Sequence, residues 1–171
     1  MPGDIEIQLS GFKELAKQLR ELPEKIARTE MDKALREAAQ PMLKAARRNA
    51  PVLPYSTTQR RAGTVRRNIR LKIFRVRGSL NRGISIGVRR LSTQQVRVNK
   101  RVARVSKRRL GVNISAYFND PFYWYFLEKG TVKMFARRFL ENAFTANRDQ
   151  FLERFKLILG GRIATIWNQK G

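Results

Sequence analysis

The sequence predicts an α+β fold in which long N-terminal helices pack on a small antiparallel β-sheet, followed by a C-terminal helix and an extended basic hairpin or arm. Apolar residues recur at helical spacing near both ends of the chain, and two central stretches alternate apolar and polar residues. The 171 residues are 42% hydrophobic, which is enough for one core. We therefore expect a single domain over residues 1–171.

The first third of the chain predicts one strand and two helices. DIEIQL at 4–9 alternates apolar and polar residues, as a short strand does. A helix is expected over 11–22, and a second helix with an alanine-rich face is expected from Pro23 to Asn49. Pro41 should interrupt this second helix, because proline lacks an N–H and crowds the preceding turn.

The middle of the chain predicts a loop and a small sheet. Residues 50–63 contain two prolines, a Ser-Thr-Thr run and a glycine, which are typical of a loop. Strands are expected at 69–73 and 84–88, joined by the turn-rich segment RGSLNRG, and ISAYF at 114–118 is a third strand candidate.

The C-terminal third begins with the aromatic segment FYWYFLEKG, which should end at Gly130. Apolar periodicity then predicts an amphipathic helix from Arg138. We expect this helix to break near Asn147 and to end near the glycine pair at 160–161.

Positive charge dominates the composition. The chain has 37 Lys and Arg against 13 Asp and Glu, a formal net charge of +24, and residues 38–119 contain 21 bases and no acid. Such a chain repels itself unless an anionic partner neutralises it. Nucleic acid is the first candidate partner, and acidic protein surfaces and anionic membranes come next. No stretch approaches the roughly 20 apolar residues of a membrane span, and the N-terminus does not resemble a secretory signal. Among these partners we do not expect a membrane.

The residue types argue against an enzyme. There is no cysteine or histidine, and no Gly-rich phosphate loop ending in Lys-Ser or Lys-Thr. The basic region offers no converging carboxylates for a metal-dependent nuclease. We expect no catalytic residue, metal site or cofactor, and interpret Glu128 as a structural hydrogen-bond acceptor.

The segment at about 89–112 is interpreted as a projecting basic arm, because its valines are too scattered for a core element and long loops are uncommon in compact domains. Its charge admits three interpretations: solvated surface, contact with nucleic-acid phosphates, or docking on an acidic protein ring. Aromatic residues do not interleave with it, which argues against base stacking, and no sequence-reading motif is present. The candidate contact residues are Arg89, Arg90, Arg97, Lys100, Arg101, Arg104, Lys107, Arg108 and Arg109.

Three blocks of sequence occur in a recognisable order: ALREAAQPMLKAARRNAP at 34–51, a glycine and the start of a strand in GTVRRNIRLKI at 63–73, and YWYFLEKGTVKMFARRFLENAF at 123–144. This layout resembles the tail-completion and head–tail joining proteins of tailed bacteriophages, including the minor tail protein Z type. Arg138 is a departure, because proline is usual there in that family.

The resemblance implies a small, non-enzymatic structural subunit of the virion, assembled in the host cytoplasm. It implies a homo-oligomeric ring, sixfold in expectation, at the head–tail junction, where it would join the connector or portal side to the tail tube or tail terminator. DNA would pass through the ring lumen. The residues that it implies as turn or interface residues are Glu128, Gly130, Thr131, Arg137 and Phe139.

A second function is compatible with the same charge. The chain could be a free nucleic-acid-binding protein without sequence preference, since phosphate contacts provide affinity without choice of sequence. Oligomeric state discriminates between the two, because the first function requires a ring and the second requires only a salt-sensitive monomer.

Overall fold

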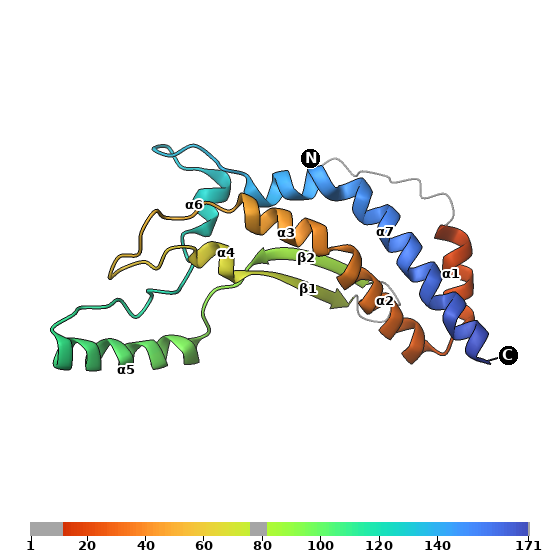
Figure 1. Cartoon of the computed structure of the whole chain (residues 1–171), viewed down its shortest axis with the longest axis horizontal. Coiled ribbons are helices and arrows are strands. Elements are labelled where there is room, and N and C mark those ends of the chain that lie inside the picture. Colours follow the sequence, from red (N-terminus) through yellow and green to blue (C-terminus); the bar gives the residue numbers. More distant parts are fainter. Residues whose placement is uncertain (1–11, 76–81, 171) are drawn as a thin grey trace. The chain divides into compact units, whose positions relative to one another are not determined.

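A computed structural model of the chain describes residues 12–75 and 82–170 (Figure 1). It confirms the predicted α+β class, with helices and one two-stranded antiparallel sheet. The elements are α1 (Phe12–Glu21), α2 (Glu24–Ala38), α3 (Gln40–Asn49), α4 (Thr64–Asn68), β1 (Ile69–Arg75), β2 (Arg82–Val88), α5 (Thr93–Leu110), α6 (Trp124–Lys129) and α7 (Phe139–Lys170).

The chain divides into two compact units. Unit 1 comprises residues up to 40, residues 73–84 and residues from 149 onward, whereas unit 2 comprises residues 41–72 and 85–148. Because β1, β2 and α7 each contribute residues to both units, the expectation of one domain over 1–171 stays a prediction.

Unit 1 has a core built from α1, α2 and the later turns of α7. The alanine-rich face of α2 is buried, with Ala27 1% and Ala34 0% exposed, and small side chains there permit close helix packing. Burial of each large apolar side chain contributes roughly 1.5–3 kcal/mol. The buried residues of this core are Leu19, Leu22, Ala27, Ala34, Leu159 and Ile163.

The predicted interruption of the second helix is confirmed. α2 ends at Ala38, and the N–H of Ala39 donates to the carbonyl oxygen of Leu35 at 3.1 Å as the turn closes. Pro41 lies in the first turn of α3, where the missing N–H breaks no helical hydrogen bond. The break therefore falls just before the proline.

Unit 2 has a core in which α3 and the start of α7 pack on the inner face of the sheet. The two predicted strands are confirmed, with Ile69 0% exposed at the start of β1. The Arg47 guanidinium donates to the Ile69 carbonyl oxygen at 3.0 Å, which joins α3 to β1. The buried residues of this core are Leu43, Ala45, Ala46, Ala50, Val65, Ile69, Phe139 and Ala143.

The segments that flank the predicted strands differ from expectation. After Gly63 the chain forms the short helix α4, which was not expected, and the strand then begins at Ile69 as predicted. The expected strand at 114–118 is wrong: the N–H of Phe118 donates to the Ser115 carbonyl oxygen at 3.0 Å, which closes a turn. Because this N–H is satisfied locally, it is not available to a neighbouring strand.

The predicted break and end of the C-terminal helix are also wrong, because α7 is continuous over 32 residues. At the expected break, the Asn147 amide donates to the Ala143 carbonyl oxygen at 2.8 Å and so remains satisfied inside the helix. At the expected end, Gly160 lies against Leu15, and Leu159 and Ile163 are buried. This packing outweighs the glycine cost of about 1 kcal/mol.

The predicted strand at 4–9 and most of the RGSLNRG turn lie outside the described residues. Within residues 12–75 and 82–170, no helix combines the length and apolar character needed to cross a membrane.

Candidate functional site

The basic segment forms a helix, α5, and not a hairpin. The expectation that it projects as an arm stays a prediction. Ser92 and Gln95 cap α5 reciprocally: the Ser92 hydroxyl accepts from the Gln95 N–H at 3.3 Å, and the Gln95 side-chain oxygen accepts from the Ser92 N–H at 2.9 Å. Gly111 closes the other end with φ of +66°. The signal was local, since a serine followed three residues later by glutamine marks a helix start.

One side of α5 rests on the segment that follows it. The Asn99 amide donates to the Ala116 carbonyl oxygen at 3.1 Å. Ala103 and Ser106 lie three or four residues further along and are partly covered. None of the 18 residues of the helix is fully buried, so α5 adds little to the core.

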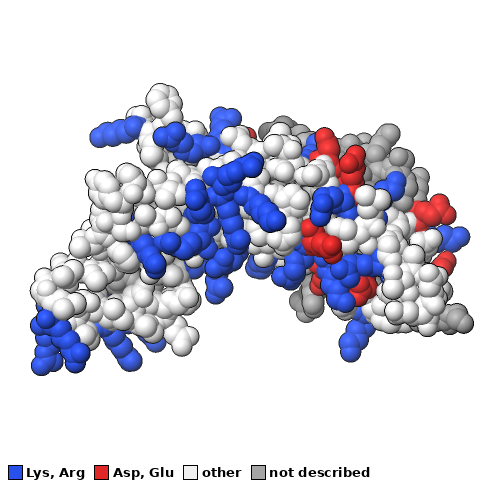
Figure 2. Space-filling view, viewed as in Figure 1, with Lys and Arg blue, Asp and Glu red and all other residues white. Residues whose placement is uncertain are grey.

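A second side of α5 carries its positive charge. Six bases recur at spacings of three or four, so they share one broad side of the helix. All six are exposed, and none has an ion pair with an acid in the part of the chain that the structure describes. Figure 2 shows basic side chains along α5 at lower left. These residues are Arg97, Lys100, Arg101, Arg104, Lys107 and Arg108.

A third side of α5 is apolar and exposed. Val98, Val102 and Val105 are 54%, 54% and 51% exposed and follow one another at spacings of four and three. Arg109 continues this valine stripe. An exposed apolar stripe on a helix is typical of a contact with another protein.

The predicted residues Arg89 and Arg90 have separate roles. The Arg90 guanidinium donates to the Asp120 carboxylate at 3.0 Å, and this carboxylate is 2% exposed. The hydrogen bond and the negative charge of Asp120 raise the pKa of Arg90. Arg90 is thus engaged in the fold, whereas Arg89 lies at the end of the sheet.

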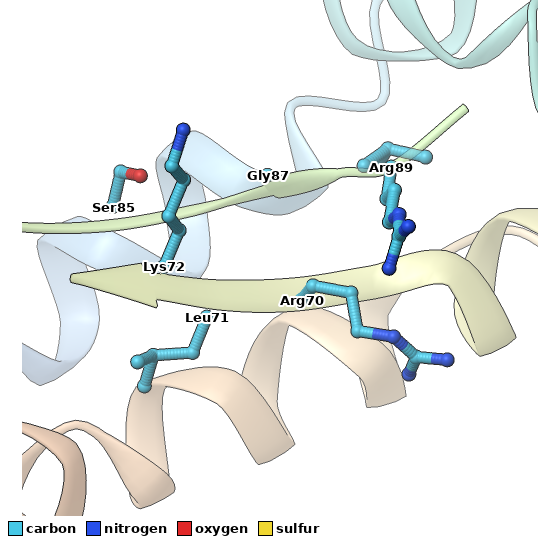
Figure 3. Close-up of a pocket in the computed structure, with 7 residues that line it drawn as sticks. Arg70, Leu71, Lys72, Ser85, Gly87 and Arg89 are labelled. Atoms are coloured by element: carbon cyan, nitrogen blue, oxygen red, sulfur yellow. The ribbon is translucent and has the colours of Figure 1, made fainter. Parts of the chain in front are cut away.

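The outer face of the sheet forms an open groove of about 580 Å³ (Figure 3). Figure 3 shows Leu71 directed toward a helix, while Lys72 and Ser85 point to the opposite side. The groove was not predicted from the sequence, although strict alternation already separates Arg70 and Lys72 from the core-facing residue between them. Its lining residues are Arg70, Leu71, Lys72, Ser85, Gly87, Val88 and Arg89.

Glu128 holds the start of α7. Its side chain is 5% exposed, and its two oxygens accept the N–H groups of Leu140 and Glu141, each at 3.0 Å. A carboxylate is favourable there because the first N–H groups of a helix lack partners and carry partial positive charge. Among the described residues, no three His, Cys, Asp or Glu side chains form a potential metal site.

The turn between α6 and α7 requires glycine at its first position. Gly130 has φ of +78°, and a Cβ atom there would lie 2.7 Å from the Met134 carbonyl oxygen. The N–H of Thr131 donates to that same oxygen at 2.8 Å, and the N–H of Arg137 donates to the Leu127 carbonyl oxygen at 2.8 Å. The turn is thus held at both ends.

The apolar residues that this turn presents differ from those proposed. Phe139 is 0% exposed and belongs to the core. Val132 and Phe135 are instead 106% and 94% exposed, which makes them the candidates for contact with another protein. Their exposure was not predictable from the sequence, because apolar residues in a short turn carry no periodic signal.

Arg138 has φ of +44°, in the left-handed region. Proline is locked near −65° and cannot adopt this conformation, so the backbone here differs from that of a chain with proline at this position. α7 nevertheless begins at the next residue, and the Arg138 carbonyl oxygen accepts the Asn142 N–H at 2.8 Å.

Unit 2 as a whole has a large cation surplus. Its sequence holds 23 Lys and Arg but only three acids, Asp120, Glu128 and Glu141. The first two are engaged as described above, and Glu141 lies 4.0 Å from the side-chain nitrogens of both Lys129 and Arg138. Every acid of unit 2 therefore has a partner inside the unit, while most of its cations do not.

Comparison with known proteins provides one match. The model of the HK97-gp10-like family, described as "Bacteriophage HK97-gp10, putative tail-component", matches residues 13–130, which is more than half of the chain. No curated protein and no solved structure matches the chain.

Proposed function

The chain belongs to the HK97-gp10-like family of bacteriophage tail components, and from this premise we propose that it forms an oligomeric ring at the head–tail junction. In this proposal six copies join the connector or portal side to the tail tube or tail terminator. DNA passes through the lumen, and the subunit has a structural rather than an enzymatic role.

The cation surplus of unit 2 carries this proposal. With all three acids engaged inside the unit, the exposed bases of α5 have no ion pair with an acid among residues 12–75 and 82–170. A ring multiplies this surplus by the number of its subunits, which makes an anionic neighbour necessary. DNA in the lumen, or an acidic surface on the connector or tail, supplies that neighbour.

Two exposed apolar features support contacts with other proteins. The valine stripe of α5 presents three side chains at helical spacing, and the α6–α7 turn presents Val132 and Phe135. Apolar side chains of this kind contribute most when a partner removes them from water. A ring subunit needs such contacts with its neighbours, whereas a solitary DNA-binding domain does not.

The alternative function is a free nucleic-acid-binding protein without sequence preference. The broad basic side of α5 favours it, because exposed lysine and arginine neutralise phosphates and release counterions. On this alternative the valine stripe and the exposed turn have no assigned use.

The mass of the full-length protein in solution tests the proposal. Light scattering at low and high salt, with and without a short DNA duplex and with the connector or tail partner added, should detect a ring-sized oligomer. A monomer that associates only with DNA, and dissociates from it as salt rises, would instead establish the alternative. A monomer under every condition would exclude the ring.

A charge variant tests the DNA path. Replacing Arg101, Arg104, Arg108 and Arg109 with glutamine should lower the salt dependence of DNA binding by about 0.9 for each phosphate that is no longer neutralised. The matched control removes the same charge from exposed positions of unit 1, through Lys17→Gln, Arg20→Gln, Lys25→Gln and Arg36→Gln. If both variants lower the salt dependence equally, the bases of α5 do not contact DNA more than other exposed bases do.

A further inference from the structure

The outer face of the sheet has a defined register. The N–H of Arg89 donates to the Asn68 carbonyl oxygen at 2.9 Å, which pairs these residues across the two antiparallel strands. Counting along the strands places Arg70 opposite Gly87 and Lys72 opposite Ser85. Arg70 and Lys72 therefore each lie opposite a small residue of β2, and this part of the face stays open.

Gly87 is not explained by packing within the chain. A Cβ atom at this position would meet nothing within 4 Å, even though glycine weakens a strand. Gly83 on the same strand is different, because a Cβ atom there would clash with the Phe74 ring. A strand glycine beside open space is typical of a place where a ligand approaches the backbone closely.

Three cations line the same groove as Gly87. Arg70, Lys72 and Arg89 line the groove and are exposed, and none has an ion pair with an acid among residues 12–75 and 82–170. The hydroxyl of Ser85 adds a hydrogen-bond donor on the same face as Lys72 (Figure 3). The groove thus offers positive charge and donors but no carboxylate.

We propose that this face is a second DNA contact, separate from α5, which binds phosphate groups of the duplex backbone. The inference rests on the proposed function, in which DNA passes the subunit. The planar guanidinium groups of Arg70 and Arg89 match phosphate oxygens in pairs, and a two-stranded ribbon is narrow enough to enter the major groove.

The glycine favours a phosphate over an acidic protein. Carboxylates sit on flexible side chains that can reach exposed cations without approaching the strand. A phosphate is part of the rigid duplex, so it can come close to β2 only where no side chain stands in its way. Gly87 supplies that gap between Arg70 and Arg89.

Removal of the three charges is the first test. The variant Arg70→Gln, Lys72→Gln and Arg89→Gln should lower the salt slope of binding to a labelled DNA duplex, measured by fluorescence anisotropy, by about 2 to 3. The control variant Lys17→Gln, Arg20→Gln and Lys25→Gln removes equal charge from unit 1 and should change the slope much less. A slope unchanged from the control would overturn the sheet-face contact but leave the DNA path through α5 intact. Absence of DNA binding by the unaltered protein would overturn both.

Gly87→Val provides a test that leaves the charge unchanged. Valine is favoured in strands, so the melting temperature of the variant should stay the same or rise. The salt slope of DNA binding should fall by about 0.9, the value for one phosphate contact, because the valine side chain covers the backbone. Gly161→Ala, at another glycine that faces open space, should leave DNA binding unaltered. Unchanged DNA binding by Gly87→Val would show that Gly87 is not needed for a phosphate to approach β2.

A phosphate-free polyanion distinguishes the two chemical classes. Poly-L-glutamate should bind the triple variant nearly as well as it binds the unit 1 control variant, which has the same net charge. It should likewise bind Gly87→Val nearly as well as it binds Gly161→Ala. If these substitutions weaken polyglutamate and DNA equally, the face binds carboxylates, and the assignment to phosphate is wrong.

Discussion

The two units of this chain use their charges differently. In unit 1, acids pair with bases from distant parts of the sequence: Arg162 reaches Glu30 at 3.1 Å and Glu37 at 2.9 Å, and Arg82 reaches Asp32 at 3.2 Å. In unit 2, all three acids are engaged, and most of the 23 bases have no ion pair with an acid of the unit. Charge thus ties elements together in unit 1 and remains available to a partner in unit 2.

This contrast teaches that net charge alone does not locate a binding surface. Arg90 belongs to the basic segment yet is held by the buried Asp120, whereas Arg97 and its neighbours on α5 have no such partner among the described residues. An arginine that has a buried carboxylate contributes to the fold, and an arginine without one is available to a partner. The following substitutions test this division, from the largest expected effect to the smallest.

The largest effect is expected where unit 2 uses an acid for its fold. Glu128→Gln should lower the free energy of unfolding by roughly 3 kcal/mol. The amide is neutral and has one acceptor oxygen, whereas the carboxylate is charged and accepts one N–H group of α7 with each of its two oxygens. Denaturant titration measures this loss. Glu141→Gln, at an exposed position in the first turn of α7, should cost less than about 1 kcal/mol. Equal losses would show that Glu128 is not a structural acceptor.

The next largest effect is expected for the ion pairs that Arg162 makes with Glu30 and Glu37 in unit 1. Arg162→Gln should cost about 1–2 kcal/mol, because two carboxylates lose the same partner. The loss should shrink as salt is added, since salt screens ion pairs. Arg154→Gln, exposed on α7, is the control. No difference between the two variants would contradict a structural role for the unit 1 charges.

The pH dependence of unit 1 follows from Glu30. The hydrogen bond from Lys33 and the contact with Arg162 lower the pKa of Glu30 from its ordinary value of 4.5. The group therefore contributes stability that is present above pH 4.5 and is lost as pH falls through its lower folded value. Glu30→Gln should destabilise by about 1 kcal/mol at about pH 7, and this difference should vanish in acid. A difference that persists at about pH 2 would mean that packing, rather than charge, explains it.

The smallest effect is expected on α5. Replacing Arg101, Arg104, Arg108 and Arg109 with glutamine should change the free energy of unfolding by less than about 0.5 kcal/mol, because these side chains are exposed and make no ion pair among the described residues. The same denaturant titration used for Glu128→Gln provides the comparison. A loss of several kcal/mol would contradict the distinction between cations that stabilise the fold and cations that are available to a partner, because it would show that the α5 charges stabilise the fold.

The local features of the sequence predicted much of the fold. Helical periodicity indicated α1 and α2, the proline-rich stretch indicated the loop at 50–63, and alternation indicated β1 and β2. The helix α5 was not predicted, because it lacks the buried apolar side that identifies most helices and has as local signals only the cap at Ser92 and the glycine at 111.

The candidate site was predictable only in part. The bases of α5 were named from sequence, but no pattern separated Arg90 from Arg89, because the partner of Arg90 lies 30 residues away. Arg70 and Lys72 were assigned to a strand and not to a site. The groove exists because β1 and β2 bring these two residues beside Arg89.

The sequence by itself determined the helical and strand periods, the break before Pro41 and the cation excess, since each depends on neighbouring residues or on composition. Tertiary structure alone decided that Glu128 caps α7 and which cations lack a carboxylate among the described residues. It also decided that α7 continues through Gly160, which lies against Leu15. These outcomes depend on contacts between residues far apart in the chain, whose energies of a few kcal/mol exceed the local preferences that they override.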